Sequence, residues 1–370
     1  MHGKLSAGTL HFSGAFAILM VFYLGGANLF GPEPGLGADG WIAQILGLFM
    51  VMPLLLIFAR LVKLLPGMDL FEMLAFAWGR WLSTIVVVFY FFYFLGLAAM
   101  VRVYYGAFVQ FVSLPNTPLV VILLAFFVLC TYLAKSGAET LGKWSLLLVS
   151  VLLVTAVALT ILAVSNMRFE NLLPLGDSGR SALMRGGARV ALSPLGGAVV
   201  LLTLLGRFDA RACPYRLFLF GAAAAVGMIA LNFLRDASIL GSGGMAVIQY
   251  PFFKAASVVQ LGEIGARIEF PMVLPVLLAG ITKAAVCLIA ASKAVRFLFR
   301  LSDENTIIIP VAFFSVGISA VLAPNLPALL ALPMLHLRAA PLFQVVLPML
   351  LWLVAEIKMS RKPILKDQVE

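Results

Sequence analysis

The stretch RVALSPLGGAVVLLTLLGRF, residues 189–208, carries Ser193-Pro194-Leu195-Gly196-Gly197 inside an apolar run long enough to cross a membrane. Proline removes a backbone hydrogen-bond donor and clashes with the preceding helical turn. Glycine loses more conformational freedom than other residues when it enters a helix. The stretch therefore predicts a membrane helix that is interrupted at these five residues.

The first apolar run of the chain, residues 5–32, has a similar weak point. In YLGGANLFGPEPGLGADGW, Tyr23 to Trp41, Gly25 and Gly26 lie well inside the run and are followed by Ala27. Interrupted segments at corresponding positions of two halves are a sequence indication of the binding site of an inverted-repeat transporter fold. A lone glycine pair is equally typical of close helix packing, so only the two interruptions together predict a site.

The composition excludes a soluble fold. Of the 370 residues, 63% are hydrophobic and only 11% are charged, whereas soluble domains carry about 25% charged residues. The mean hydropathy is +1.08. The apolar runs are continuous rather than alternating, which favours helices over a membrane β-barrel.

The residues that carry chemistry in enzymes and metalloproteins are sparse. The three cysteines are far apart and the three histidines are isolated, so neither a metal site nor another cofactor is expected. We find no catalytic constellation and predict that the protein is not an enzyme. The net charge of +10 is not clustered with aromatic residues, which argues against nucleic-acid binding.

Ten apolar runs predict an all-α integral membrane protein of about ten transmembrane helices, arranged as a 5+5 inverted repeat with helices one and six broken. The runs are residues 5–32, 41–59, 81–101, 118–134, 144–167, 190–206, 217–234, 270–292, 306–322 and 339–355. The expected units are a first repeat (1–165), an extracytoplasmic connecting segment (166–189), a second repeat (190–355) with an amphipathic outer helix near 250–266, and a cytoplasmic tail (356–370).

The basic residues predict the orientation, because Lys and Arg are retained in cytoplasmic loops. With the N-terminus and the C-terminus both inside, the short outer loops carry few of them. The inner segments then hold Lys4, Arg60, Lys63, Arg80, Lys135, Lys143, Arg207, Arg211, Arg216, Lys293, Arg296, Arg300, Lys358, Arg361, Lys362 and Lys366. The acidic residues Asp236, Glu263 and Glu269 are interpreted as a solvated face of an outer segment.

We expect a small zwitterion to bind between the interruptions at Gly25-Gly26-Ala27 and at residues 193–197, because unwound backbone exposes N–H and C=O groups and half-helix N-termini favour a carboxylate. Helices three and eight would close the pocket through Tyr93, Leu97, Thr282 and Lys283. Tyr93 and Leu97 are four residues apart and share a helix face. Packing alone would also account for Tyr93.

Lys283 is a charge near the middle of an apolar run, which is costly in a membrane and by default functional. Its ammonium group is compatible with three roles: filling a cation site between helices one, five and eight, pairing with a ligand carboxylate, or snorkelling to the interface. Thr282 offers a hydroxyl to the ligand or, equally, to a carbonyl of its own helix.

Five stretches resemble the B subunits of spore germinant receptors, the spore germination permeases of the amino acid–polyamine–organocation superfamily. They are KLSAGTLHFSGAFAILMVFYLGG, the segment from ARLVKLLPGMDLFEML to AAMVRVY, NLLPLGDSG, ALSPLGGAVVLL and the segment from YPFFKAASVVQLGEIGARIEF to SKAVRFLF. The resemblance covers nearly the whole chain. It implies a LeuT-type fold, recognition of a nutrient such as an amino acid, and residence in the spore inner membrane beside A- and C-type subunits.

One position departs from the resembled family, whose members often have an acidic residue after the break in helix six, in a Pro-Phe-Gly-Glu pattern. This chain has Pro194-Leu195-Gly196-Gly197 there, so a ligand ammonium group loses a possible carboxylate partner. The hypothesis is a nutrient sensor that binds a small germinant at the membrane midplane and signals to its partner subunits. The alternatives are a proton- or sodium-coupled amino acid transporter and a membrane scaffold that binds nothing.

Overall fold

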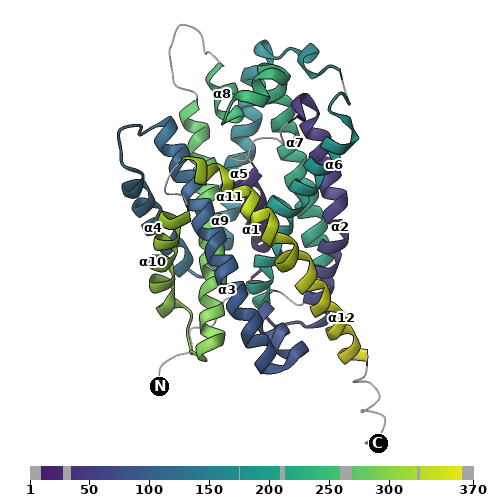
Figure 1. The fold of residues 1–370 in the computed structure, drawn as a ribbon, viewed down its shortest axis with the longest axis vertical. Helices are drawn as coiled ribbons and strands as arrows, with labels where there is room; N and C mark the ends of the chain where they lie inside the picture. The colour runs from purple at the N-terminus through teal and green to yellow at the C-terminus, as the bar shows by residue number, and fades with distance from the viewer. Residues whose placement is uncertain are drawn as a thin grey trace, which may run out of the picture.

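The computed structural model describes residues 10–27, 35–174, 176–208, 213–258, 269–322 and 326–360 as a bundle of helices (Figure 1). The main helices are α1 (Phe12–Ala27), α2 (Gly40–Leu64), α3 (Leu70–Val112), α4 (Leu119–Lys135), α5 (Ala138–Ala163), α6 (Gly179–Val190), α7 (Pro214–Val247), α8 (Pro251–Val258), α9 (Glu269–Phe299), α10 (Asn305–Leu322), α11 (Leu326–Ala340) and α12 (Leu347–Ser360). Short 3-10 helices are η1 (Gly37–Asp39), η2 (Val164–Asn166), η3 (Phe169–Leu172), η5 (Gly196–Thr203) and η6 (Leu205–Arg207), and π-helices are η4 (Ala191–Leu195) and η7 (Pro341–Val346).

The helices account for the predicted membrane runs. Eight helical segments of the described chain are long and apolar enough to cross a membrane, and α1 and α4 are shorter apolar helices that match the first and fourth runs. Four of the eight segments are composite. Two only add a short 3-10 helix to an α-helix, η1 to α2 and η2 to α5. Of the other two, one joins α6, η4 and η5, and the other joins most of α11 to η7 and α12. The prediction of an all-helical membrane protein is confirmed.

Several helices extend beyond the runs predicted from hydropathy, and two of them bear on the site. The sixth helix begins at Gly179, inside the segment 166–189 that we predicted as a connection. Its first part is too polar for a hydropathy signal, but Gly186 and Gly187 let it approach α2 closely. The seventh helix, α7, continues past Leu234 to a kink at Gly241 and then on to Val247. Arg235 and Asp236 pair with each other, so these charges remain inside the bundle.

α8 is the described part of the predicted outer amphipathic helix, and residues 259–268, including Glu263, lie outside the described residues. Phe252 and Ala256 on one side of α8 are buried, while Lys254 is exposed. The ring of Phe252 lies 5.4 Å from that of Phe108 near the end of α3. The described part therefore packs its apolar side on the bundle.

The end of the bundle that holds Arg60, Arg80, Arg207 and Arg296, here called the basic end, is tied together by ion pairs. Arg296 of α9 donates to Asp69 Oδ2 (3.2 Å) and to Glu304 Oε2 (2.8 Å). Arg207 reaches Glu304 Oε1 at 3.5 Å. Asp69 also caps α3 through a capping box with Glu72. These contacts join three connections of the bundle at one end.

Removing the Glu304 carboxylate should destabilise the basic end. Burial by itself would raise the pKa of Glu304, but the cations Arg296, Lys293 and Arg207 hold that pKa below its ordinary value. A lowered pKa in the folded state means that the carboxylate contributes stability above the ordinary glutamate range, and that this stability is lost as the pH falls. We expect Glu304→Gln to cost about 1.5–3 kcal/mol near neutral pH and less in acid.

Thermal unfolding of the purified protein at neutral and acidic pH measures this effect. Asp303→Asn is the matched control, because Asp303 is exposed and the asparagine keeps the acceptor for the backbone N–H of Asn305. Equal melting temperatures for Glu304→Gln and the wild type at neutral pH would contradict the assignment.

Candidate ligand site

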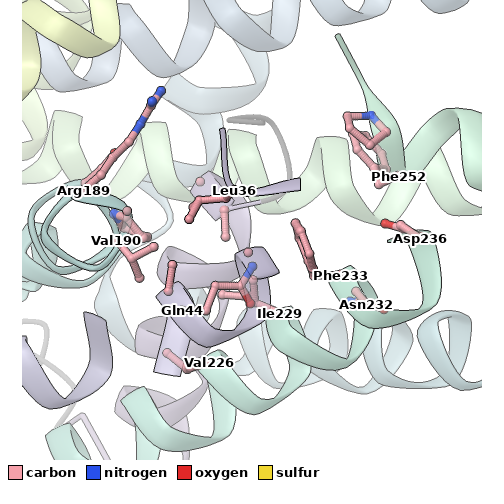
Figure 2. Close-up of a pocket in the computed structure, with 18 of the residues that line it drawn as sticks. Leu36, Gln44, Arg189, Val190, Val226, Ile229, Asn232, Phe233, Asp236 and Phe252 are labelled. Carbon is pink, nitrogen blue, oxygen red and sulfur yellow. The ribbon is translucent and has the colours of Figure 1, made fainter. Parts of the chain in front are cut away.

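A cavity of about 110 Å³ lies between the end of α1, the start of α2, the sixth helix, α7 and α8 (Figure 2). Most of its lining is apolar, with Leu36, Val190, Val226, Ile229 and Phe233 among the walls. The polar or charged side chains on it are Gln44, Arg189, Ser193, Asn232 and Asp236. A concave, mostly apolar site with a few polar groups is typical of a small-molecule site.

Five of the twelve residues predicted for the ligand site line this cavity. They are Gly26, Ala27, Ser193, Pro194 and Leu195. The two interruptions recognised in the sequence therefore meet at one cavity. Gly25, Gly196, Gly197, Tyr93, Leu97, Thr282 and Lys283 are not among its lining residues.

The sixth helix changes its winding at the cavity. It is an α-helix to Val190, a π-helix over Ala191–Leu195 and a 3-10 helix over Gly196–Thr203. Pro194 lies in the π-helix and has no N–H to donate, so the regular α-helical bonding cannot continue through it. The interruption is thus a change of helix type rather than an extended segment. Short π-helices occur frequently at functional sites.

Gly25 and Gly26 are still helical in α1, which ends at Ala27, so the unwinding predicted at the glycines does not occur at these two residues. Close packing against α9 explains why residue 25 is a glycine. A Cβ on Gly25 would lie 2.6 Å from the carbonyl oxygen of Ala279 in α9. The Gly25 carbonyl, in the last turn of α1, accepts a hydrogen bond of 2.8 Å from the Tyr105 hydroxyl, because helix ends leave carbonyls without intrahelical donors.

Lys283 reaches α1 from α9. Its Nζ occupies the space that a side chain on Gly26 would need, and lies 4.6 Å from the centre of the Phe22 ring. A cation over an aromatic face is stabilised electrostatically. Lys283 is 5% exposed and lies behind the cavity, next to Gly26. Its predicted place beside helix one is observed, but it does not line the cavity.

Gly196 makes room for Gln344 of η7, and Gly197 makes room for Phe22 of α1. A Cβ on Gly196 would collide with the Gln344 side chain, and one on Gly197 would lie 3.2 Å from the Phe22 ring. The Gln344 amide nitrogen donates to the Tyr93 hydroxyl at 2.7 Å. Tyr93 stacks on Phe343 with 4.4 Å between ring centres. Packing inside the bundle therefore accounts for Tyr93.

Thr282 makes the bond within its own helix that the sequence left open. Its hydroxyl donates to Leu278 O at 2.8 Å and accepts from the Trp144 indole at 3.1 Å. Leu97 is buried in the core beside α3's other apolar residues. The predicted helices three and eight, α3 and α9 of the structure, therefore pack around the cavity without lining it.

Asp236 corrects one interpretation from the sequence. It is 4% exposed and pairs with Arg235, whereas the sequence pattern indicates a solvated face. Figure 2 places Asp236 and Phe233 on one side of the cavity and Arg189 and Val190 on another. The sequence also did not select Gln44 or Asn232. The sequence did contain one indication for Asp236: two adjacent residues of opposite charge, Arg235 and Asp236, directly follow the apolar run 217–234 and could pair inside the bundle.

Comparison with solved structures supports the fold. A substrate-bound outward-open Na⁺-coupled sialic acid symporter matches with a TM-score of 0.64 and 14% identity, over 90% of this chain and 79% of that one. MhsT in complex with L-phenylalanine matches with a TM-score of 0.65 and 13% identity, over 91% of this chain and 87% of that one. The two-half transporter fold predicted from the paired interruptions is confirmed.

Comparison of sequences identifies the family. Spore germination protein KB of Bacillus subtilis (strain 168) is 23% identical over 352 residues, which are 94% of each chain. The family model described as "Spore germination protein" matches residues 9–325. The chain therefore belongs to the spore germination protein family of multi-pass membrane proteins.

Proposed function

We propose that the protein is the nutrient-sensing subunit of a spore germinant receptor, and that its ligand is a small molecule, an amino acid, bound in the cavity between α1, α2, α6, α7 and α8. The observation that carries the proposal is that both interrupted helices contribute to this one cavity. Backbone groups at the end of α1 and in η4 border the same space, so a ligand there contacts the last turn of one helix and the π-helical turn of the other.

Signalling follows from differential affinity, because a ligand shifts a conformational equilibrium only when it binds one state better. The ligand would bridge α1 and the sixth helix. At the basic end Leu10 N–H donates to Arg207 O at 2.9 Å, so the same two segments are also joined there. A relative movement of the two at the cavity would therefore be transmitted to the basic end.

In the proposed setting the chain lies in the inner membrane of the spore with the basic end in the cytoplasm, as the positive-inside rule favours. A- and C-type receptor subunits are the proposed partners that receive the signal. The family match and the membrane helices support this placement.

Exchange of this subunit in spores tests the sensor function. Spores that carry it in place of their own B-type subunit should germinate with a different preference among the standard L-amino acids. An unchanged preference would refute the proposal. Net uptake of an amino acid into liposomes that contain the purified chain would instead support the coupled transporter, and absence of any binding would support the scaffold.

Filling the cavity should weaken ligand binding. Ile229 lines the cavity from α7, and the larger side chain of Ile229→Trp takes up space that the ligand needs. Forcing both into the cavity costs about 1–3 kcal/mol, so we expect amino acid affinity to fall about tenfold. The affinity is measured by calorimetric titration of the purified variant with the amino acid that gives the strongest germination response. Leu231→Trp is the matched control, because Leu231 is 69% exposed on the same helix and should leave binding unchanged. Equal losses in both variants would exclude this cavity as the site.

A further inference from the structure

We propose that a second, smaller cavity is a side-chain subsite of the ligand cavity, and that Phe252 of α8 closes this subsite and so limits the size of the ligand. The inference rests on the proposed ligand function of the larger cavity, here called the main cavity, and names the residue that selects among ligands.

The second cavity has a volume of about 30 Å³ and lies between α1, α5, α7, α8 and α9. One water molecule needs about 10–15 Å³ of such space, so the cavity has room for about two groups of that size. Most of its lining is apolar and comes from Leu24, Leu152, Ala156, Met228 and Val276. Apolar cavities stay dry and accept apolar groups. The end of an aliphatic side chain therefore matches this space.

The two cavities lie side by side along α7, and the helical repeat explains why. Residues that are three or four positions apart share one face of a helix. One such row lines the second cavity and consists of Met228, Asn232 and Arg235. The adjacent row lines the main cavity and consists of Ile229, Phe233 and Asp236. The boundary between the cavities therefore runs along α7, between these two rows.

Asn232 and Phe252 line both cavities and form the wall between them, here called the partition. The Asn232 side chain is held by a hydrogen bond of 3.1 Å from Arg235 Nη1 to its Oδ1. Phe252 comes from the outer helix α8 and packs its ring 5.4 Å from that of Phe108. Figure 2 shows both residues of the partition at the end of the main cavity that is away from Arg189. A ligand that extends toward this end meets the partition before it reaches the second cavity.

The polar side chains on the second cavity are bonded within the protein. The Thr155 hydroxyl donates to Val151 O at 2.9 Å. Arg235 donates to Asn232 and forms an ion pair with Asp236. The second cavity thus offers mainly apolar surface to a ligand, and opening the partition should favour longer apolar side chains.

Phe252→Ala tests the inference, because it removes the aromatic part of the partition and joins the two cavities. The probes are the straight-chain amino acids from L-alanine to L-2-aminooctanoate, which differ by one methylene group each, titrated calorimetrically into the purified full-length protein. In the wild type, affinity should fall sharply beyond one chain length. In Phe252→Ala this length limit should move to a chain at least one methylene group longer. One methylene group in a hydrophobic pocket changes affinity by about tenfold or more, so the first chain that the wild type rejects should gain about tenfold in affinity relative to L-alanine.

Three further variants locate the effect. Phe253→Ala is the matched control, because the Phe253 ring also lies near that of Phe108, at 6.3 Å, but lines neither cavity. It should leave the length limit unchanged. The double variant Phe252→Ala/Ala156→Leu refills the second cavity from α5 and should restore the wild-type limit. Phe252→Leu keeps an apolar contact with the bundle and should move the limit in the same direction, even if Phe252→Ala does not fold.

The inference is overturned if the wild type shows no length limit, if the folded Phe252 variants keep the wild-type limit, or if Phe253→Ala moves it equally. It is also overturned if the double variant keeps the longer limit, because the added length then does not occupy the second cavity. If the wild type binds none of the probes, the proposed function fails, and the inference falls with it.

Discussion

Gly25→Ala is expected to destabilise the protein strongly, whereas Gly26→Ala, one residue later in α1, should be tolerated by the fold. The added Cβ at Gly25 would lie 2.6 Å from the oxygen and 2.8 Å from the carbon of the Ala279 carbonyl. These are backbone atoms of a long helix, so the clash can be relieved only by moving α1 away from α9. Overpacking of this kind costs about 1–3 kcal/mol.

At Gly26 the added methyl would meet only the flexible end of the Lys283 side chain. The ammonium group can rotate aside, so we expect a loss below about 1 kcal/mol, within the range of tolerated substitutions. Thermal unfolding of the two purified variants beside the wild type measures both effects. Equal melting temperatures for the two variants would show that contact with the Ala279 backbone is not what selects glycine at position 25.

Asp236→Asn is the second change with a large expected effect. It leaves the Arg235 guanidinium, 3% exposed, without its anionic partner inside the bundle. Removing one member of a buried ion pair typically costs about 3–5 kcal/mol, because the other charge remains buried and uncompensated. We therefore expect a large fall in melting temperature or in the yield of folded protein.

The double variant Arg235→Gln/Asp236→Asn should recover most of that loss, since it removes both charges and keeps polar side chains of similar shape. A thermodynamic cycle of the two single variants and the double variant gives the coupling energy between the residues. We expect the coupling to exceed about 1 kcal/mol, the upper value typical of exposed pairs. Independent, additive losses would contradict a coupled pair at this position.

The family and the fold were accessible from the sequence for different reasons. The resemblance depended on stretches spread over nearly the whole chain, and the comparisons confirm it. The paired interruptions predicted the two-half fold through a local property, the absence of regular helix-forming residues at two points. Of the two glycine pairs only Gly26 lines the candidate cavity, and the contacts of the glycines were not foreseen. Gly25 packs on α9 and Gly196 on Gln344.

The lining of the candidate site was only partly predictable. Residues 193–195, Gly26 and Ala27 were selected because an irregular backbone was expected there. They do line the cavity, although Gly26 and Ala27 are helical. Tyr93 and Lys283 were selected because a polar group inside an apolar run needs a partner. That reasoning was sound, but the Tyr93 hydroxyl accepts from Gln344 and the Lys283 ammonium lies over Phe22. Neither partner was identifiable without knowing which helices touch.

The sequence by itself determined that this protein lies in a membrane, that it is helical and in which order its apolar segments follow one another. These depend on local properties, because every backbone hydrogen bond of a membrane helix must be made within its own segment. Only the tertiary structure decided which faces of those helices enclose a cavity. Asp236 and Gln44 are nearly two hundred positions apart, and they share one cavity because of how α2 and α7 pack and rotate about their axes. The rotation of a helix about its axis depends on its contacts with all of its neighbours at once. The sequence of one segment does not contain that information.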